Sequence, residues 1–344
     1  MSTASGLAYF YPEGHAVHVV PHHPETPERV ETIQSALDQV GWLKQFTHIR
    51  AHDLPRGLLE SVHQPAYLDM LEMSCRRGIG YLDTDTYFTA DSWRLANQAA
   101  GGALAVAQAV WNGSSRCGFA LTRPPGHHAR AGQGMGFCLL NNIALAAEGI
   151  LQIGARKLAI VDLDLHHGNG TQEIFWQRGD VLYLSTHQLP LFPYSGNLDE
   201  TGAGLGEGCT ANFPLPPMSG DTAFQQVMDG LIIPLLDRYQ PEMILVSYGY
   251  DPHWLDPFGS LLLSAAGYAS LAGKLVAWAD EHCGGKIAWF LEGGYNMEAA
   301  QACSLGVVAA LIGEPWDDPI GPAPFPEGHS WQHMVERGRQ FWGI

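Results

Sequence analysis

Four ionisable side chains lie within six positions directly after an apolar run. The segment IVDLDLHHGNGT at 160–171 contains Asp162, Asp164, His166 and His167. In an extended chain, residues two apart point the same way, so Asp162, Asp164 and His166 share one face. Two neighbouring carboxylates in a buried site repel each other, and a bound cation removes that repulsion. Ligation by Asp and His suits zinc, iron or manganese better than calcium.

A catalytic zinc ion typically has three protein ligands and keeps one position open. The 160–171 segment therefore needs to supply only two of the three ligands. Asp251, in SYGYDPHWLDP at 247–257, is the preferred third ligand, with Asp256 as the rival. Asp256 precedes a proline and is more readily explained as a turn residue. The alternative to a metal is an Asp–His hydrogen-bond network, which the density of ionisable groups makes the weaker interpretation.

Two further segments carry groups that could transfer protons or stabilise charge. RPPGHH at 123–128 ends in His127 and His128. The unperturbed pKa of histidine lies near neutrality, so this pair could act as general base and general acid. In EGGYN at 292–296, Tyr295 could donate to an oxygen that gains negative charge, a contribution of roughly 10²–10³ in rate. A structural histidine or a packed tyrosine is the alternative at each position.

These clusters follow runs that read as buried strands, apolar on both faces. Strands are predicted at 117–123, 157–163, 181–187, 243–249 and 286–292, and helices at 26–41, 142–153, 222–239 and 264–282. The alternation predicts an α/β fold with a mainly parallel sheet. Because ligands bind at the carboxyl ends of such strands, we expect the polar clusters to form one site.

Composition limits the remaining possibilities. The chain has 344 residues, 46% of them hydrophobic, and no linker or repeat, which favours a single domain. Its net charge is −17 with only 18 Lys and Arg, so direct nucleic-acid binding is not expected. We expect no signal peptide and no membrane span, since Ser264, Gly267 and Lys274 interrupt the longest apolar stretch. With no CxxC pair among the six cysteines, we expect reduced thiols and a cytoplasmic location.

Several of these segments together resemble the signature blocks of the histone deacetylase and acetylpolyamine amidohydrolase superfamily. The blocks are HHPETPERV, VHQPAYLDML, RPPGHHA, GMGFCLLNN, IVDLDLHHGNGTQEIF, SYGYD and LEGGYN. They occur in the order seen in that family and span most of the chain. The resemblance implies the arginase/deacetylase fold, a parallel sheet with helices on both faces. It also implies that residues 1–344 form one histone deacetylase-like catalytic domain.

The resemblance also implies a set of site residues. The zinc ligands would be Asp164, His166 and Asp251, and the catalytic residues His127, His128, Asp162, Asn169 and Tyr295. The substrate channel would involve Gly136, Phe137, Phe192, Phe258 and Asp85. A structural potassium would involve Asp162, Asp164, His166, Ser185 and Thr186. Ferrous iron is the alternative to zinc.

Within this set, Asp162 would orient His127, and His128 would be the main general base and acid. Tyr295 would polarise the substrate carbonyl. Two positions depart from parts of the family. Asn169 stands where some members have Asp, which would leave His128 oriented by a neutral amide. Phe258 replaces the acidic residue of some polyamine-selective members.

The leading prediction is a zinc-dependent amidohydrolase that removes acyl groups, such as acetyl, from acyl-lysine-like amines. The second is a deacylase of acetylpolyamines or other small molecules. The net acidity favours this second prediction, while Phe258 and the short 72–87 segment, with no room for a dimer-forming insertion, weigh against it. The third is a non-catalytic acyl-lysine binder, against which the competent residue at every catalytic position argues. The sequence predicts no particular oligomeric state.

Overall fold

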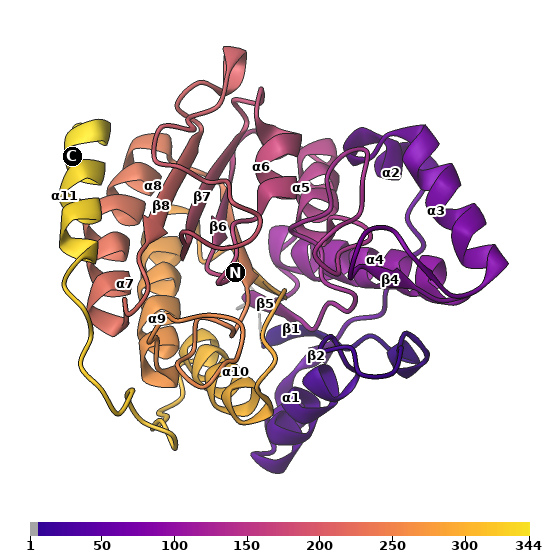
Figure 1. Ribbon diagram of the computed structural model, residues 1–344, viewed down its shortest axis with the longest axis horizontal. Helices are drawn as coiled ribbons and strands as arrows, with labels where there is room; N and C mark the ends of the chain where they lie inside the picture. The colour runs from indigo at the N-terminus through magenta and orange to yellow at the C-terminus, as the bar shows by residue number, and fades with distance from the viewer. Residues whose placement is uncertain (1–5) are drawn as a thin grey trace.

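An eight-stranded sheet runs through the centre of the molecule (Figure 1). The computed structural model describes residues 6–344. The strands are β1 (Leu7–Phe10), β2 (Thr47–His48), β5 (Cys117–Ala120), β6 (Leu158–Asp162), β7 (Val181–Gln188), β8 (Thr210–Leu215), β9 (Met243–Tyr248) and β10 (Ile287–Leu291). Their order is β2-β1-β5-β10-β9-β6-β7-β8, and the pairings in this sheet are parallel. A separate antiparallel pair joins β3 (Gly80–Tyr81) to β4 (Tyr87–Phe88).

Helices cover both faces of the sheet (Figure 1). One face carries α1 (Glu28–Gln39), α7 (Asp221–Val227), α8 (Ile233–Tyr239), α9 (Ala265–His282), α10 (Met297–Ile312) and α11 (Trp331–Trp342). The other carries α2 (Arg56–Val62), α3 (Pro65–Arg77), α4 (Ser92–Trp111), α5 (Asn142–Gln152) and α6 (Asn169–Phe175). Short 3-10 turns lie at His15–Val17, Trp42–Gln45 and Gly204–Gly206.

The central strands are apolar on both sides because each face packs against its own helical layer. In β10, Trp289 belongs to the hydrophobic core under α9 and α10, whereas Ala288 and Phe290 belong to the core under α4 and α5. Both layers exclude water, so successive side chains are apolar although they point in opposite directions. The predicted fold class, a parallel sheet with helices on both faces, is confirmed.

The five predicted strands correspond to β5, β6, β7, β9 and β10. Strands β1, β2 and β8 were not predicted. Strand β2 has only two residues, and β8 at the sheet edge mixes Asn212 and Pro214 with apolar residues. The predicted helix 222–239 is interrupted by a π-helical turn at Met228–Ile232. None of the helices in the described part of the chain combines the length and apolarity needed to cross a membrane.

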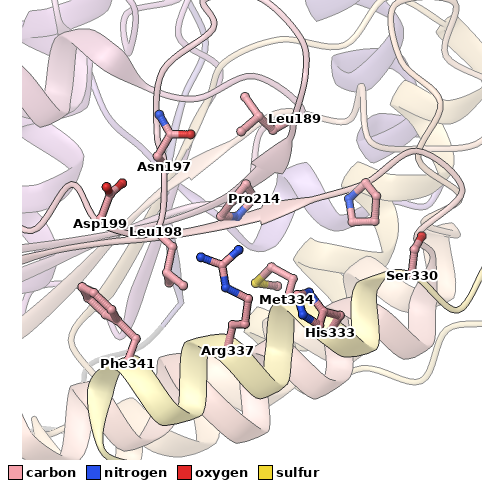
Figure 2. A pocket seen from close by; sticks show the side chains of 11 residues that line it. Leu189, Asn197, Leu198, Asp199, Pro214, Ser330, His333, Met334, Arg337 and Phe341 are labelled. Carbon is pink, nitrogen blue, oxygen red and sulfur yellow. The ribbon is translucent and has the colours of Figure 1, made fainter.

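Parallel pairing places the carboxyl ends of β5, β10, β9, β6 and β7 at one edge, in adjacent positions. The predicted polar clusters follow four of these strands and therefore meet there. A cavity of about 410 Å³ lies elsewhere, between α11 and the loop after β7, where the side chains of Leu198, Met334 and Arg337 face it (Figure 2).

Candidate active site

Three side chains from two neighbouring strand ends bring their donor atoms together. Asp164 and His166 follow β6, Asp251 follows β9, and β6 pairs with β9. One donor atom from each residue lies within 4.8 Å of the other two. His166 Nδ1 lies 3.2 Å from Asp164 Oδ1 and 3.1 Å from Asp251 Oδ2. We call this group the metal triad (Asp164, His166 and Asp251).

The surroundings of the metal triad fit a divalent cation. Both carboxylates are buried, and Asp251 Oδ2 has no hydrogen-bond partner among the described residues. The backbone of Gly249 and Gly293 packs closely against the carboxylates, since a Cβ atom would lie 1.9 Å from Asp164 Oδ2 at Gly249 and 2.5 Å from Asp251 Oδ2 at Gly293. Two buried carboxylates and an imidazole nitrogen suit zinc or ferrous iron. Asp256, the rival third ligand, lies outside this group.

Asp162 shares the segment but binds protein groups instead. Its Oδ2 accepts hydrogen bonds from His127 Nδ1 at 3.1 Å and from the Tyr183 hydroxyl at 3.0 Å. Burial lowers the pKa of His127, but Asp162 and Asp164 raise it more strongly, to about 10. Both carboxylates thus favour the protonated form of His127, whose Nε2 lies 3.7 Å from Asp164 Oδ1.

His128 has the opposite electrostatic environment. Its Nδ1 donates to Asn169 Oδ1 at 2.8 Å, and its ring lies against that of His127, with 4.1 Å between the centroids. Burial lowers the pKa of His128 well below its usual value, and His127 and His166 lower it further. Because Nδ1 carries the proton, Nε2 is left with a free lone pair. His128 is thus neutral and able to accept a proton, as a general base must be.

Glu292, at the end of β10, was not predicted as a functional residue. Its Oε2 accepts hydrogen bonds from the backbone N–H groups of Gly126 at 2.7 Å and His127 at 3.0 Å, and its Oε1 accepts one from Ser247 Oγ at 3.0 Å. Burial raises the pKa of Glu292 to about 7, against the lowering effect of His127. Glu292 thereby fixes the loop that carries both histidines. An acid at the end of a buried strand was the available sequence signal.

A buried ion cluster, also not predicted, supports the opposite side of the site. Glu25 pairs with Arg29 at 3.0 Å and with Arg123 at 2.8 Å, and all three side chains are buried. Arg29 also donates to the carbonyl oxygens of Glu292 and Gly294. The i, i+4 spacing of Glu25 and Arg29 was visible in the sequence, but their long-range partners were not. The cluster ties the start of α1 to the loop before Tyr295.

Tyr295 is held by its backbone and by its ring. Its N–H donates to Asp256 Oδ2 at 2.6 Å, and the guanidinium of Arg29 lies 4.9 Å from the centroid of its ring. Burial, followed by the charge of Asp251, raises the pKa of Asp256 to about 7. Asp256 also accepts from the N–H of Phe258 at 3.0 Å. Its role is therefore to shape the Tyr295 loop, in keeping with its interpretation as a turn residue.

Three of the predicted channel residues pack against the site histidines or Tyr295. The ring of Phe192 lies 5.1 Å from His128, and the ring of Phe258 lies 4.3 Å from Tyr295 (centroid distances). Phe137 lies 5.8 Å from Tyr295 on the third side. Gly136 has a φ of 54°, and a Cβ there would lie 2.4 Å from the His128 ring, so only glycine fits.

Asp85 lies farther out, exposed at the rim. Its carbonyl oxygen accepts from His23 Nε2 at 2.9 Å, and the His23 ring packs 4.6 Å from that of Phe137. His15, His18, His22 and His23 are not part of a metal-binding group in the described residues. His23 instead packs against the rings of Phe137 and Tyr87, a contact that sequence reasoning did not identify.

The residues of the predicted potassium site also converge in part. Asp162 and Ser185 are register partners on β6 and β7. The Ser185 hydroxyl bonds His187 Nδ1 at 2.8 Å, while Thr186 Oγ1 is buried without a partner among the described residues. The potassium site stays a prediction. His167, by contrast, bonds Ser195 Oγ and Gln172 Oε1 and supports the neighbouring loop.

Comparison with known proteins agrees with this geometry. The histone deacetylase domain family matches residues 23–311. A probable deacetylase of Archaeoglobus fulgidus is 42% identical over 296 residues, which cover 85% of this chain and 82% of that protein. A histone deacetylase-like amidohydrolase of Pseudomonas aeruginosa is 35% identical over 294 residues, covering 85% of this chain and 77% of that protein.

A solved structure extends the likeness to three dimensions. The crystal structure of the HDA15 HD domain matches with a TM-score of 0.90 and 33% identity, over 99% of this chain and 96% of that one. The match covers the whole sheet and the loops at its carboxyl edge. The chain therefore belongs to the histone deacetylase family.

Proposed function

We propose that this protein is a zinc-dependent amidohydrolase that removes acyl groups, acetyl among them, from the side-chain amine of acyl-lysine residues. The observation that carries the proposal is the convergence of the metal triad beside two histidines whose environments drive their pKa values apart. Family membership supports a deacetylase or amidohydrolase. The metal and the substrate are the parts that we propose.

Asp164, His166 and Asp251 would hold the metal. A zinc ion there, when bound, would make a water molecule more acidic and polarise the carbonyl of the scissile amide. The backbone of Gly249 and Gly293 packs against the two carboxylates and would keep them in place for the metal.

The protein's own proton carriers would be the two histidines. Neutral His128 would accept the proton of the attacking water at Nε2, because Nδ1 is occupied by Asn169. Protonated His127, fixed by Asp162, would offset the negative charge that develops and keep a proton available for the departing amine. The products are a carboxylate and a free amine.

Tyr295 would donate its phenolic proton to the carbonyl oxygen as that oxygen gains charge. Asp256 and Arg29 hold the backbone of its loop, which would limit the positions open to the side chain. The aromatic walls from Phe137, Phe192 and Phe258 suit the narrow aliphatic stem of an acylated lysine.

An acylpolyamine deacylase is the second candidate. The net charge of −17 favours a cationic substrate, whereas Phe258 supplies no carboxylate at the mouth. The structural potassium and the cytoplasmic location remain further proposals beside either function.

Turnover of acetyl-lysine peptides, longer acyl-lysine peptides and acetylated polyamines, with metal analysis alongside, tests the proposal. We expect acyl-lysine peptides to be cleaved by protein that holds one metal ion per chain. Tyr295→Phe should lower kcat by roughly 10²–10³ and retain the metal. Tyr239→Phe is the matched control, because it removes a tyrosine hydroxyl at the end of α8, where that hydroxyl donates to the Gly179 carbonyl away from the site. Metal-loaded protein that cleaves none of these substrates would contradict the proposal and favour a non-catalytic binder.

A further inference from the structure

A cavity of about 550 Å³ lies beside the substrate channel. It is formed by the loop before the channel residue Gly136, by α6 and the residue after it, and by the loop that follows β7. The lining residues that matter for its chemistry are Met135, Asn169, Glu173, Trp176, Pro193 and Glu200. We call this cavity the side pocket.

The side pocket shares its walls with the channel. Met135 precedes Gly136 and Phe137 in the chain, and Pro193 follows Phe192. Asn169, a third lining residue, holds His128 by the 2.8 Å hydrogen bond from Nδ1. The side pocket therefore borders the predicted channel residues and the hydrogen bond that holds His128.

The lining combines apolar surface with excess negative charge. Met135, Trp176 and Pro193 are apolar, and Glu173 and Glu200 supply two carboxylates. The single lining cation is Arg130, which forms an ion pair with Glu173.

The Glu200 carboxylate is held in place inside this lining. It accepts hydrogen bonds from the N–H of Gly196 at 3.1 Å and from Gln172 Nε2 at 2.7 Å. One guanidinium thus balances only one of two carboxylates, in a chain of net charge −17. A tryptophan beside the Glu200 carboxylate, which forms no ion pair among the described residues, favours a cation on an aliphatic stem.

We propose that the side pocket receives a lysine or arginine side chain that neighbours the acyl-lysine in a peptide substrate. This rests on the proposed function and narrows its substrate class to peptides with a basic residue near the acylated one. In a peptide, side chains of neighbouring residues leave the backbone sideways, toward a pocket beside the channel. The distal amine of a linear acylpolyamine would instead lie along the line of the acyl chain.

Matched substrates test the side pocket. One acetyl-lysine peptide carries Arg near the acetyl-lysine, and its partner carries Gln at the same position. An acetylated diamine and an acetylated monoamine of equal length form the second pair. We expect the Arg peptide to have a kcat/KM roughly threefold or more above the Gln peptide, through KM, with the ratio falling as salt is raised. The two acetylated amines should not differ by such a ratio.

Variants place the preference in the side pocket. Trp176→Ala and Glu200→Gln should each bring the Arg/Gln ratio toward one. Glu336→Gln, which makes the same charge change on the exposed face of α11, should leave the ratio as in the natural protein. An Arg/Gln ratio that survives both side-pocket variants would overturn the proposal, as would a ratio of one in the natural protein.

Binding separates this inference from the proposed reaction. Fluorescence anisotropy of the labelled Arg and Gln peptides reports the side pocket whether or not any peptide is cleaved. Preferred binding of the Arg peptide without turnover would leave the side pocket standing and sink the proposed function. Equal binding of both peptides with normal turnover would overturn the side-pocket proposal and leave the proposed function standing. A diamine preferred over the monoamine, with no peptide preference, would show that the pocket takes a polyamine amine and overturn the peptide assignment.

Discussion

At the scale of single residues, Asn169 sets the proton affinity of His128. Its amide oxygen accepts from Nδ1 without adding charge, while burial, His127 and His166 keep the pKa of His128 low. Asn169→Asp would place a carboxylate at the same distance, which stabilises the imidazolium and raises the pKa of His128. Because the general base acts in its neutral form, the acid limb of kcat/KM against pH should move to higher pH. A limb that stays in place or moves to lower pH contradicts this role.

Glu292 carries a second prediction at this scale. Glu292→Gln keeps an oxygen that can accept from Gly126 and His127, and an amide that can donate to Ser247. Glu292→Leu leaves two buried N–H groups without an acceptor, at about 1–3 kcal/mol each. Urea unfolding should therefore show a much larger loss of stability for Leu than for Gln. Equal losses for the two variants would mean that these hydrogen bonds do not hold the loop.

At the scale of elements, the close approach of β9, β10 and β6 at their carboxyl ends makes the site. Gly249, directly after β9, allows it, since a Cβ there would lie 1.9 Å from Asp164 Oδ2 and 2.5 Å from Asp251 Oδ1. We expect Gly249→Ala to lose metal affinity at least tenfold, since a displaced ligand costs about 1.4 kcal/mol or more. Competition with a chelator measures this metal affinity.

The matched control is a glycine with free space around it. Gly273, inside α9, has no atom within 4 Å of its would-be Cβ. Gly273→Ala should bind metal normally and stabilise the protein by about 0.4–1 kcal/mol, because alanine has less freedom to lose on folding. If Gly249→Ala binds metal as well as Gly273→Ala does, the packing of Gly249 against the carboxylates is not what keeps the triad in place.

At the scale of the whole molecule, buried histidines couple stability to pH. His63 bonds the Arg130 carbonyl and the Asn141 N–H, both at 3.0 Å. Burial lowers its pKa from 6.5 to about 4. Between these values the unfolded chain binds more protons, so this stability is complete above pH 6.5 and is lost as pH falls toward 4.

His63→Gln retains a donor and an acceptor but cannot titrate. As pH falls from 6.5 to 4, the unfolding free energy of this variant should fall less steeply than that of the natural protein. The two slopes should differ by up to about 1.4 kcal/mol per pH unit, the value for one bound proton. Above pH 7 the two slopes should agree. Denaturant unfolding at several pH values gives both slopes, and equal slopes between pH 4 and 6.5 would contradict a neutral buried His63.

The place of the site could be predicted from the sequence because the carboxyl ends of neighbouring parallel strands lie at one edge of the sheet. Asp164, His166 and Asp251 follow buried apolar runs, so their convergence followed from the α/β pattern together with the family resemblance. Glu200, in the loop after β7, lines the side pocket although no sequence motif singled it out.

What the sequence did not predict depends on contacts between distant segments. Glu25 meets Arg123 across 98 positions, and Glu292 meets Gly126 across 166. No local periodicity encodes such pairs. The edge strand β8 was missed for a related reason, since its register follows from β7 and not from an apolar pattern of its own.

The central claim is that the metal triad holds one metal ion on which amide hydrolysis depends. The most direct test removes metal with a chelator and titrates zinc back while turnover of an acetyl-lysine peptide is followed. We predict that turnover is lost on chelation, rises linearly with added zinc and saturates at one equivalent, and that Asp251→Ala does not recover. Full turnover after complete removal of metal, or saturation only at two equivalents, would contradict the account.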